Sequence, residues 1–328
     1  MPTHKYLSLY CLFALAALFS TLPGCTKHSP SNSNPSLTNV TLALNWMPEI
    51  EHGGFYTALL NGHYKDAGLN VEILPGGPNA PVAQRVATKQ VDFGVSSADR
   101  TLQARAAGAN LVTLLAPLQH SPRCLMTHPE SNITSFDQIK DVTLAMSESD
   151  PYSQFLKSRL PLNNVRIVPY TGSIAQFLVD KKMIIQGYTF SEPILAQAKG
   201  VTPKILTISD FGYDPYNSTL ITHSDLLKEK PELVQKIIEA TQKGWIDFLK
   251  DPAKTNDFIH ALNPEMDRDA MTQGMPALNK LCQPPTGSPF GGMTKARWDE
   301  LGQQLIDLKL LEPGTDISTA WTPLPAAN

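Results

Sequence analysis

The sequence predicts an α/β protein of two lobes, each a doubly wound, mostly parallel sheet with flanking helices, with a hinge between the lobes. Three observations carry this prediction. Short apolar runs of strand length alternate with segments of helical period, which is typical of parallel strands joined by helices. Two irregular connectors, 119–126 and 210–217, interrupt this alternation and predict two crossings between lobes. From Pro231 onward the pattern is helical, with an apolar stripe from Leu233 to Leu249.

The first lobe is expected to span residues 40–118, and it opens with the most distinctive stretch of the chain. Val40 to Leu44 alternates as a strand, stops at Asn45-Trp46, turns through Pro48 and restarts as a helix after Gly53-Gly54. A strand that enters a helix through a polar, aromatic loop is the unit that forms crevices in open α/β sheets. Further strands are predicted at 71–74, 91–95 and 111–116, and helices at 82–89 and 99–107.

The second lobe is expected to span residues 119–216, and residues 217–328 are expected to return to the first lobe and end in helices. Strands are predicted at 142–146, 165–168, 184–189 and 205–208, and helices at 135–140, 151–160, 173–179 and 191–198. The helices of the return segment are predicted at 231–250, 257–262, 268–281 and 294–308. A faint repeat links the lobes, because Ala83-Gln84 and Lys89 recur as Ala175-Gln176 and Lys181 at a constant shift.

The N-terminal segment indicates export. His4-Lys5 precede an apolar run from Leu7 to Phe19 that is too short to span a bilayer, so residues 1–24 are predicted to be a signal peptide. Leu22-Pro23-Gly24-Cys25 resembles the lipobox of bacterial lipoproteins, which implies lipidation of Cys25 and a membrane anchor. An ordinary secretory signal is the alternative. Residues 25–39 are rich in Ser, Asn and Pro and are predicted to be a flexible tether.

Composition and cysteine content exclude some partners. The chain holds 27 Lys+Arg and 30 Asp+Glu without a basic run, so nucleic acid is not expected as a partner. Export permits a disulfide between Cys124 and Cys282, but the sequence leaves their pairing open. The sequence contains no Cys-x-x-Cys motif and no His cluster, so no metal site is predicted. We expect the protein to be a monomer and to bind no cofactor.

Several motifs resemble the THI5/NMT1-like branch of periplasmic substrate-binding proteins. They are Leu44-Asn-Trp-x-Pro with His52-Gly-x-Phe-Tyr56, Gly62-x-Tyr64, Gly68-Leu69-x-Val71, Val91-Asp-Phe-Gly-Val95, Ser191-Glu192-Pro193 and Lys230-Pro-Glu232. The resemblance covers about Val40 to Trp298. It implies a type II binding fold that closes on a small molecule and delivers it to an ABC importer permease.

The resemblance also implies a ligand class. Members of this branch bind heteroaromatic compounds, either thiamine-precursor pyrimidines or riboflavin. The Trp of the Asn-Trp motif, here Trp46, stacks on the ligand ring, and Glu192 matches a Glu that meets the ligand's amino group. Residues 182–186 read Lys-Met-Ile-Ile-Gln and depart from the usual Gly-x-Val-Asp-Ala, so the exact ligand does not carry over.

An enzyme of the same fold is the less favoured alternative. A pyrimidine synthase in this family consumes its own His and uses a cysteine-rich iron segment. These features would fall near Arg100 and near Gly212 to Tyr216, and the sequence has neither the His nor a Cys there. The resemblance therefore implies a binding protein and no enzyme.

The loops at the predicted strand ends supply aromatic rings and carboxylates, while Arg100 and Arg123 are the nearby cations. Two rings can hold a flat ligand, and a carboxylate selects an amino group, so this balance favours a neutral or amine-bearing ring. A sulfonate, taurine or nitrate binder is the alternative, and it would need cations without facing carboxylates. Packing, helix capping and loop hydrogen bonds are the alternative roles of the candidate residues. The candidates are Asn45, Trp46, Glu49, His52, Tyr56, Ser96, Ser97, Asp99, Tyr152, Tyr188, Glu192 and Tyr216.

Overall fold

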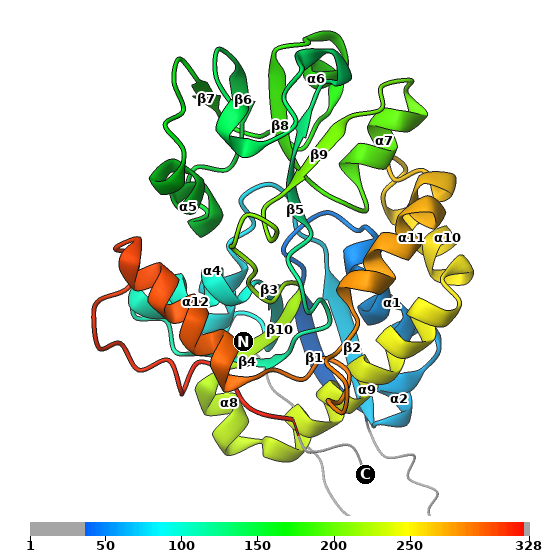
Figure 1. Ribbon diagram of the computed structural model, residues 1–328. Coiled ribbons are helices and arrows are strands. Elements are labelled where there is room, and N and C mark those ends of the chain that lie inside the picture. The colour runs from blue at the N-terminus through cyan, green and yellow to red at the C-terminus, as the bar shows by residue number, and fades with distance from the viewer. Residues whose placement is uncertain (1–36, 325–328) are drawn as a thin grey trace, which may run out of the picture. The chain divides into compact units, whose positions relative to one another are not determined.

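The computed structural model describes residues 37–324 and contains two five-stranded sheets with flanking helices (Figure 1). The predicted signal peptide, Cys25 and most of the predicted tether lie outside the described residues. In this part of the chain, no helix is both long enough and apolar enough to span a membrane. Cys124 and Cys282 are both buried and free, so the disulfide that the sequence left open is not formed.

The first sheet has the strand order β2-β1-β3-β10-β4. Its strands are β1 (Thr38–Ala43), β2 (Leu69–Leu74), β3 (Phe93–Ser96), β4 (Leu111–Leu115) and β10 (Thr219–His223). β1 pairs in parallel with β2 and β3, whereas β10 runs antiparallel to β3 and β4. Four strands therefore share one direction, and one strand from the return segment opposes them.

The second sheet repeats this arrangement with the order β7-β6-β8-β5-β9. Its strands are β5 (Arg123–Thr127), β6 (Thr143–Ala145), β7 (Arg166–Val168), β8 (Met183–Tyr188) and β9 (Lys204–Thr207). β6 pairs in parallel with β7 and β8, and β5 runs antiparallel to β8 and β9. The two sheets thus have the same spatial order of strand directions, although the reversed strand comes last along the chain in the first sheet and first in the second. This likeness gives a structural basis to the faint repeat in the sequence.

The predicted fold class is confirmed, and the structure adds that each mostly parallel sheet contains one reversed strand. The sequence predicts an irregular crossing at residues 119–126 and no element at 219–223. These segments form β5 and β10, the reversed strand of each sheet. Each of these strands begins directly after or within a segment that connects the two sheets. The flanking turns and helices that mark the other strands are therefore missing. The lobe boundaries and the hinge stay predictions.

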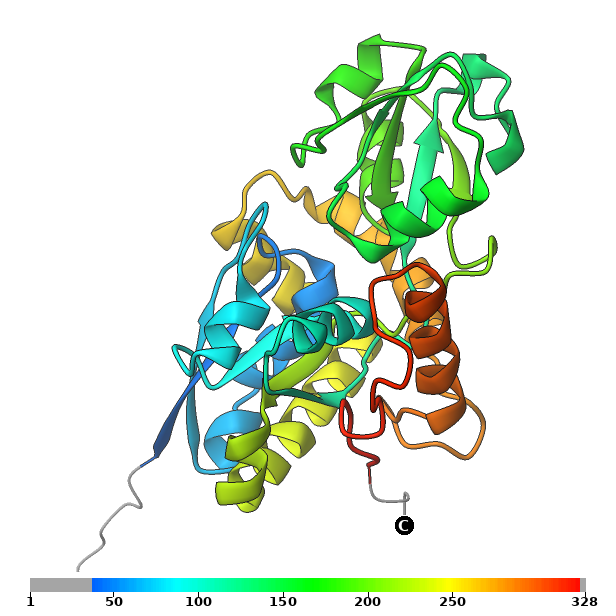
Figure 2. The ribbon, with the colours of Figure 1, turned by 90° about the vertical axis from the view of Figure 1, so that its left-hand side faces the viewer.

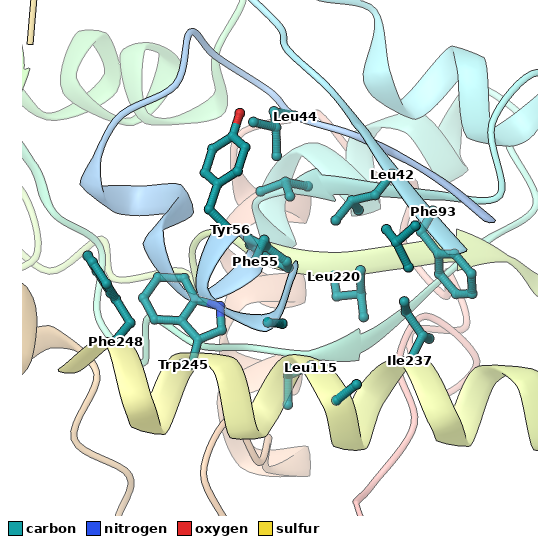
Figure 3. Close-up of a cluster of buried hydrophobic side chains, with 14 of the residues drawn as sticks. Leu42, Leu44, Phe55, Tyr56, Phe93, Leu115, Leu220, Ile237, Trp245 and Phe248 are labelled. Atoms are coloured by element: carbon teal, nitrogen blue, oxygen red, sulfur yellow. The ribbon is translucent and has the colours of Figure 1, made fainter. Parts of the chain in front are cut away.

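Alternation along the strands divides the first sheet between two cores. Leu42 and Leu44 face a core shared with α1 (Gly53–Leu60) and α9 (Pro231–Lys250), whereas Ala43 faces α3 (Val82–Ala87) and α4 (Ala98–Ala106). This follows from the period of two in a strand. Figure 3 shows Trp245 and Phe248 of α9 directed toward Phe55 of α1. The rings of Phe55 and Trp245 meet edge to face with centroids 5.8 Å apart.

The second sheet is covered in the same way. Leu125 and Leu144 face α5 (Pro151–Arg159), and Cys124 and Ala145 face α6 (Ala175–Val179) and α7 (Glu192–Ala198). Figure 2 shows these elements in green, turned to another side. The remaining helices are α2 (His63–Asp66), α8 (Ser224–Glu229), α10 (Ala253–Leu262), α11 (Arg268–Leu281) and α12 (Lys295–Asp307), with short 3₁₀ turns at Ile50–His52, Pro129–Ser131 and Phe136–Gln138.

Candidate functional site

A pocket opens where strands of both sheets end. It encloses about 640 Å³ of empty space, open solvent included, and is called the main pocket below. Three aromatic rings, three glutamates, two arginines and three side-chain amides contribute to its wall. The lining residues are Asn45, Trp46, Glu49, Glu51, Pro78, Asn79, Arg100, Arg123, Ser147, Tyr170, Gln186, Gly187, Tyr188 and Glu192.

Two glycines position Trp46. Gly76 lies so close to the loop after β1 that a Cβ atom on it would stand 2.2 Å from the carbonyl oxygen of Leu44, and its N–H donates to the Trp46 carbonyl at 3.0 Å. The absence of a side chain at Gly76 therefore lets two loops of the first sheet pack backbone to backbone. The half-buried indole of Trp46 reaches Gly172, where a Cβ would lie 3.1 Å from its Cζ2. Trp46 thus contacts the segment that follows the second sheet's β7.

A buried hydrogen-bond network holds the loop after β1 from below. Asn45 Nδ2 donates to Glu51 Oε1 at 3.1 Å, and His52 Nε2 lies 3.0 Å from Asn45 Oδ1 and 3.1 Å from Glu51 Oε1. Ser218, at the start of β10, donates to the other Glu51 oxygen at 3.2 Å. Burial alone would raise the pKa of Glu51, but His52 and these hydrogen bonds outweigh it and lower the pKa. Glu51 therefore stays ionised and fixes Asn45 beside the pocket.

Glu49 and Glu192 meet the pocket from opposite sheets. Burial, followed by the charges of Glu51 and Glu192, holds the pKa of Glu49 well above its ordinary value of 4.5. Burial also raises the pKa of Glu192, although Tyr188 N–H donates to it at 2.7 Å and Tyr170 OH at 2.8 Å. Ser191 donates to Glu49 across the sheets at 3.1 Å. Both carboxyl groups can exchange hydrogen bonds with a ligand, and Glu49 retains its proton to a higher pH than an exposed glutamate.

The raised pKa of Glu49 makes stability depend on pH. The folded protein binds this proton more tightly than the unfolded chain does. The proton's contribution to the free energy of unfolding is therefore complete below about pH 4.5 and is lost as pH rises through the folded-state pKa. We expect Glu49→Gln to be more stable than the wild type at neutral pH, with a difference that shrinks toward pH 4.5. Urea unfolding across this pH range measures it. Glu265→Gln, at an exposed site, should follow the wild type, and a parallel curve for Glu49→Gln would contradict the assignment.

The two arginines of the pocket are already paired. Arg100 forms an ion pair with Asp150 from the second sheet's side, and Arg123 Nη2 lies 3.6 Å from the other oxygen of Asp150. The Arg123 guanidinium also stacks on Tyr152 and Tyr188, at 4.4 and 5.1 Å from the ring centroids. One carboxylate therefore faces both cations, and Arg123 is also enclosed by two rings.

Five of the twelve predicted residues come together in the main pocket. They are Asn45, Trp46, Glu49, Tyr188 and Glu192. Ser97, Asp99 and Tyr152 line a smaller polar cavity beside it, which shares Arg100 and Arg123 with the main pocket. There Asp99 accepts from Ser97 at 2.5 Å, from the Arg100 N–H at 2.8 Å and from Tyr213 at 3.0 Å.

The other four predicted residues lie elsewhere. His52 is fully buried beneath Asn45, and Ser96 borders a shallow groove between α3 and α4. Tyr56 packs on Phe258, with ring centroids 5.5 Å apart. Tyr216 lies under Arg297, 3.9 Å from its ring centroid, and its hydroxyl accepts from the Thr294 N–H at 3.0 Å. A ligand contact at these four positions stays a prediction, and their observed contacts are with the protein itself.

Sequence reasoning did not assign several lining residues. Tyr170, Ser147 and Gln186 lie at or just after the carboxyl ends of β7, β6 and β8, so the rule that ligands bind at strand ends could have found them. Arg123 was noted as a cation near these loops but was not assigned to the site. It begins β5, and in a reversed strand the amino end reaches the edge where the other strands finish. Ser218 precedes β10 in the same way.

The described residues contain no group of three or more His, Cys, Asp or Glu side chains placed to hold a metal ion. A sequence model described as NMT1/THI5 like matches residues 49–255, more than half of the chain. The chain belongs to the NMT1/THI5-like family. This confirms the resemblance on which the sequence analysis relied.

Relatives of known name include binding proteins and synthases. The riboflavin-binding protein RibY of Chloroflexus aurantiacus is 25% identical over 89% of this chain and 87% of its own length. The formylaminopyrimidine-binding protein of Halalkalibacterium halodurans is 21% identical, with 92% of each chain covered. A 4-amino-5-hydroxymethyl-2-methylpyrimidine phosphate synthase of Legionella pneumophila is 23% identical over 87% of this chain and 91% of its own.

Solved structures agree on the fold. The periplasmic aliphatic sulphonate binding protein SsuA of Escherichia coli matches with a TM-score of 0.66 and 13% identity, over 89% of this chain and 95% of that chain. At this identity the likeness shows the fold alone, and it confirms the predicted periplasmic-binding-protein fold with flanking helices. Membership of the family and the two related binding proteins support a solute-binding role for this chain.

Proposed function

We propose that the protein is an extracytoplasmic solute-binding protein that captures a small heteroaromatic compound, a thiamine-precursor pyrimidine or a riboflavin-like molecule. One observation carries the proposal. The rings of Trp46, Tyr170 and Tyr188 border the same pocket as the carboxyl groups of Glu49 and Glu192. Aromatic walls hold a flat ring, and carboxyl groups select its amino or imino hydrogens. RibY and the formylaminopyrimidine-binding protein, both relatives of this chain, are named for ligands of this kind.

The charge balance of the pocket favours a neutral or amine-bearing ligand over a sulfonate or nitrate. An anion site needs donors whose charge is not already cancelled. Here Asp150 pairs with both Arg100 and Arg123, and Glu51 adds a further negative charge. The SsuA likeness, which concerns the fold, does not carry its ligand over to this chain.

A role as a binding protein is favoured over that of a synthase. The resemblance places the synthase's consumed His near Arg100, and the Arg100 side chain is engaged with Asp150. Two of the relatives named above are binding proteins.

Export, anchoring and delivery belong to the same proposal. The predicted signal peptide and lipobox supply export and a lipid on Cys25 that holds the domain at the membrane. The importer permease is the expected partner. A structure from Staphylococcus aureus that matches this fold with a TM-score of 0.64 is the ligand-binding component of an ABC-type import system. Globomycin treatment of expressing cells tests the anchor, because it should cause the unprocessed precursor to accumulate.

A ligand panel tests the function directly. The mature domain from Leu37 onward would be melted with riboflavin, thiamine, 4-amino-5-hydroxymethyl-2-methylpyrimidine, taurine and nitrate. A ligand present at about 100 times its Kd adds about 2.7 kcal/mol to the free energy of unfolding and raises Tm measurably. We expect a rise with one of the flat heterocycles. A rise with taurine or nitrate alone would overturn the proposal, and product formation from the pyrimidine compounds would favour the synthase.

A further inference from the structure

Gln186 is a buried amide in the wall of the main pocket. It lies on β8, is 7% exposed, and belongs to the segment that departs from the family's usual sequence. Its neighbours along β8, Gly187 and Tyr188, also line the pocket, and Glu192 follows one turn later. A side-chain amide here can offer a ligand either its carbonyl oxygen or its NH₂ group, and these would select opposite ligands.

The surrounding donors decide which end faces the ligand. The backbone N–H of Ser147 lies 2.7 Å from Gln186 Oε1, and the Tyr152 hydroxyl donates to the same oxygen. A backbone N–H can only donate, so turning the amide over would bring two donors together. The oxygen is therefore held away from the ligand. Within residues 37–324, Gln186 Nε2 has no hydrogen-bond acceptor of its own.

The packing around Tyr152 keeps this arrangement in place. Tyr152 is 2% exposed, and the Arg123 guanidinium lies 4.4 Å from its ring centroid. Arg123 also stands opposite Tyr188 in the β5–β8 ladder, so it is tied to the strand that carries Gln186. A side chain fixed in this way donates along one direction without losing further rotamer freedom when the ligand binds.

We propose that Gln186 is a specificity-determining residue that donates a hydrogen bond to an acceptor on the ligand ring, beside Glu192, which accepts from an adjacent N–H. The ligand class is then a ring edge with a hydrogen-bond acceptor next to an N–H donor. The ring nitrogen and amino group of a 4-aminopyrimidine form such an edge, and so do the carbonyl and N–H of a flavin. This inference rests on the proposed function. It adds the requirement that the ligand carry a hydrogen-bond acceptor beside its N–H donor, so an aromatic amine without such an acceptor should bind poorly.

The test combines one substitution with one pair of ligands. Gln186→Glu keeps the size of the side chain and an oxygen for Ser147 and Tyr152, and at alkaline pH, where the new carboxyl group is ionised, it replaces the NH₂ donor by an acceptor. Calorimetric titration would use 4-amino-5-hydroxymethyl-2-methylpyrimidine, its analogue with C–H in place of the ring nitrogen beside the amino group, and riboflavin. We expect Gln186→Glu to weaken binding of the aminopyrimidine or riboflavin by about 10- to 100-fold. The wild type should bind the C–H analogue of the aminopyrimidine at least about tenfold more weakly than the parent compound.

Gln197→Glu is the matched control, because it adds the same charge at an exposed position of α7 outside the pocket. This variant should bind the ligands with the affinity of the wild type. Equal affinity of Gln186→Glu and the wild type would overturn the inference and leave the proposed function intact. If Gln186→Glu does not fold, equal affinity of the wild type for the aminopyrimidine and its C–H analogue would overturn it instead. Binding of neither heterocycle by the wild type would overturn the proposed function and this inference together.

Discussion

Trp46→Ala is expected to weaken binding of the heterocyclic ligand by about 100-fold while leaving Tm almost unchanged. An aromatic side chain that a bound ligand buries contributes about 2 kcal/mol or more to binding, and its removal loses both ring stacking and apolar burial. The stability of the free protein should change little because the indole is only half-buried and lies at the pocket rim beside Gly172.

The measurement is calorimetric titration of the wild type and the variant with riboflavin and with 4-amino-5-hydroxymethyl-2-methylpyrimidine, paired with thermal melts. Trp46→Phe is the control, since it keeps an aromatic face and should recover part of the affinity. Binding of a flat ring to the wild type should also change the tryptophan fluorescence, and this change should be smaller in Trp46→Phe. Full affinity in Trp46→Ala would place the ligand away from this ring.

Gly54→Ala is expected to destabilise the fold by about 3 kcal/mol, since overpacking a close contact costs about 1–3 kcal/mol and occasionally more. A Cβ on Gly54 would lie 2.0 Å from Cγ of Trp245, and a Cβ on Gly244 would lie 2.4 Å from the Gly54 carbonyl oxygen. Trp245 is fully buried between α1 and α9 (Figure 3), so it has no space into which it can move. The helices would have to separate, and the loop after β1 would lose its support.

Urea or thermal unfolding measures this effect. For a chain of this size we expect Tm to fall by roughly 6–12 °C. Gly77→Ala is the matched control, because a Cβ there meets nothing within 4 Å, and it should remain within about 0.5 kcal/mol of the wild type. Equal stabilities of Gly54→Ala and Gly77→Ala would contradict the close approach of α1 and α9.

Local patterns predicted most elements because these patterns act over short distances. Helix α9 was predicted at its observed bounds from an apolar stripe, Pro231 at its start and Asp251-Pro252 after its end. Eight of the ten strands, the loop at Asn45-Trp46 and the family resemblance were found in the same way. Of the two strands that were missed, β5 begins inside the connector 119–126 and β10 follows the connector 210–217, and neither connector has a regular apolar period.

By itself, the sequence determined the α/β class, the order of most elements, the family resemblance, and the position of Trp46 on a loop and Glu192 at a helix start, each after a strand end. Only the tertiary structure decided which side chains meet. Arg123 reaches the pocket because β5 is reversed, and Asp150, before a helix start distant in the sequence, lies 3.6 Å from its Nη2 atom. Gln186 presents its NH₂ group because Ser147, 39 residues earlier in the chain, donates to its oxygen. Such contacts depend on strand order and direction, which no local pattern of residues encodes.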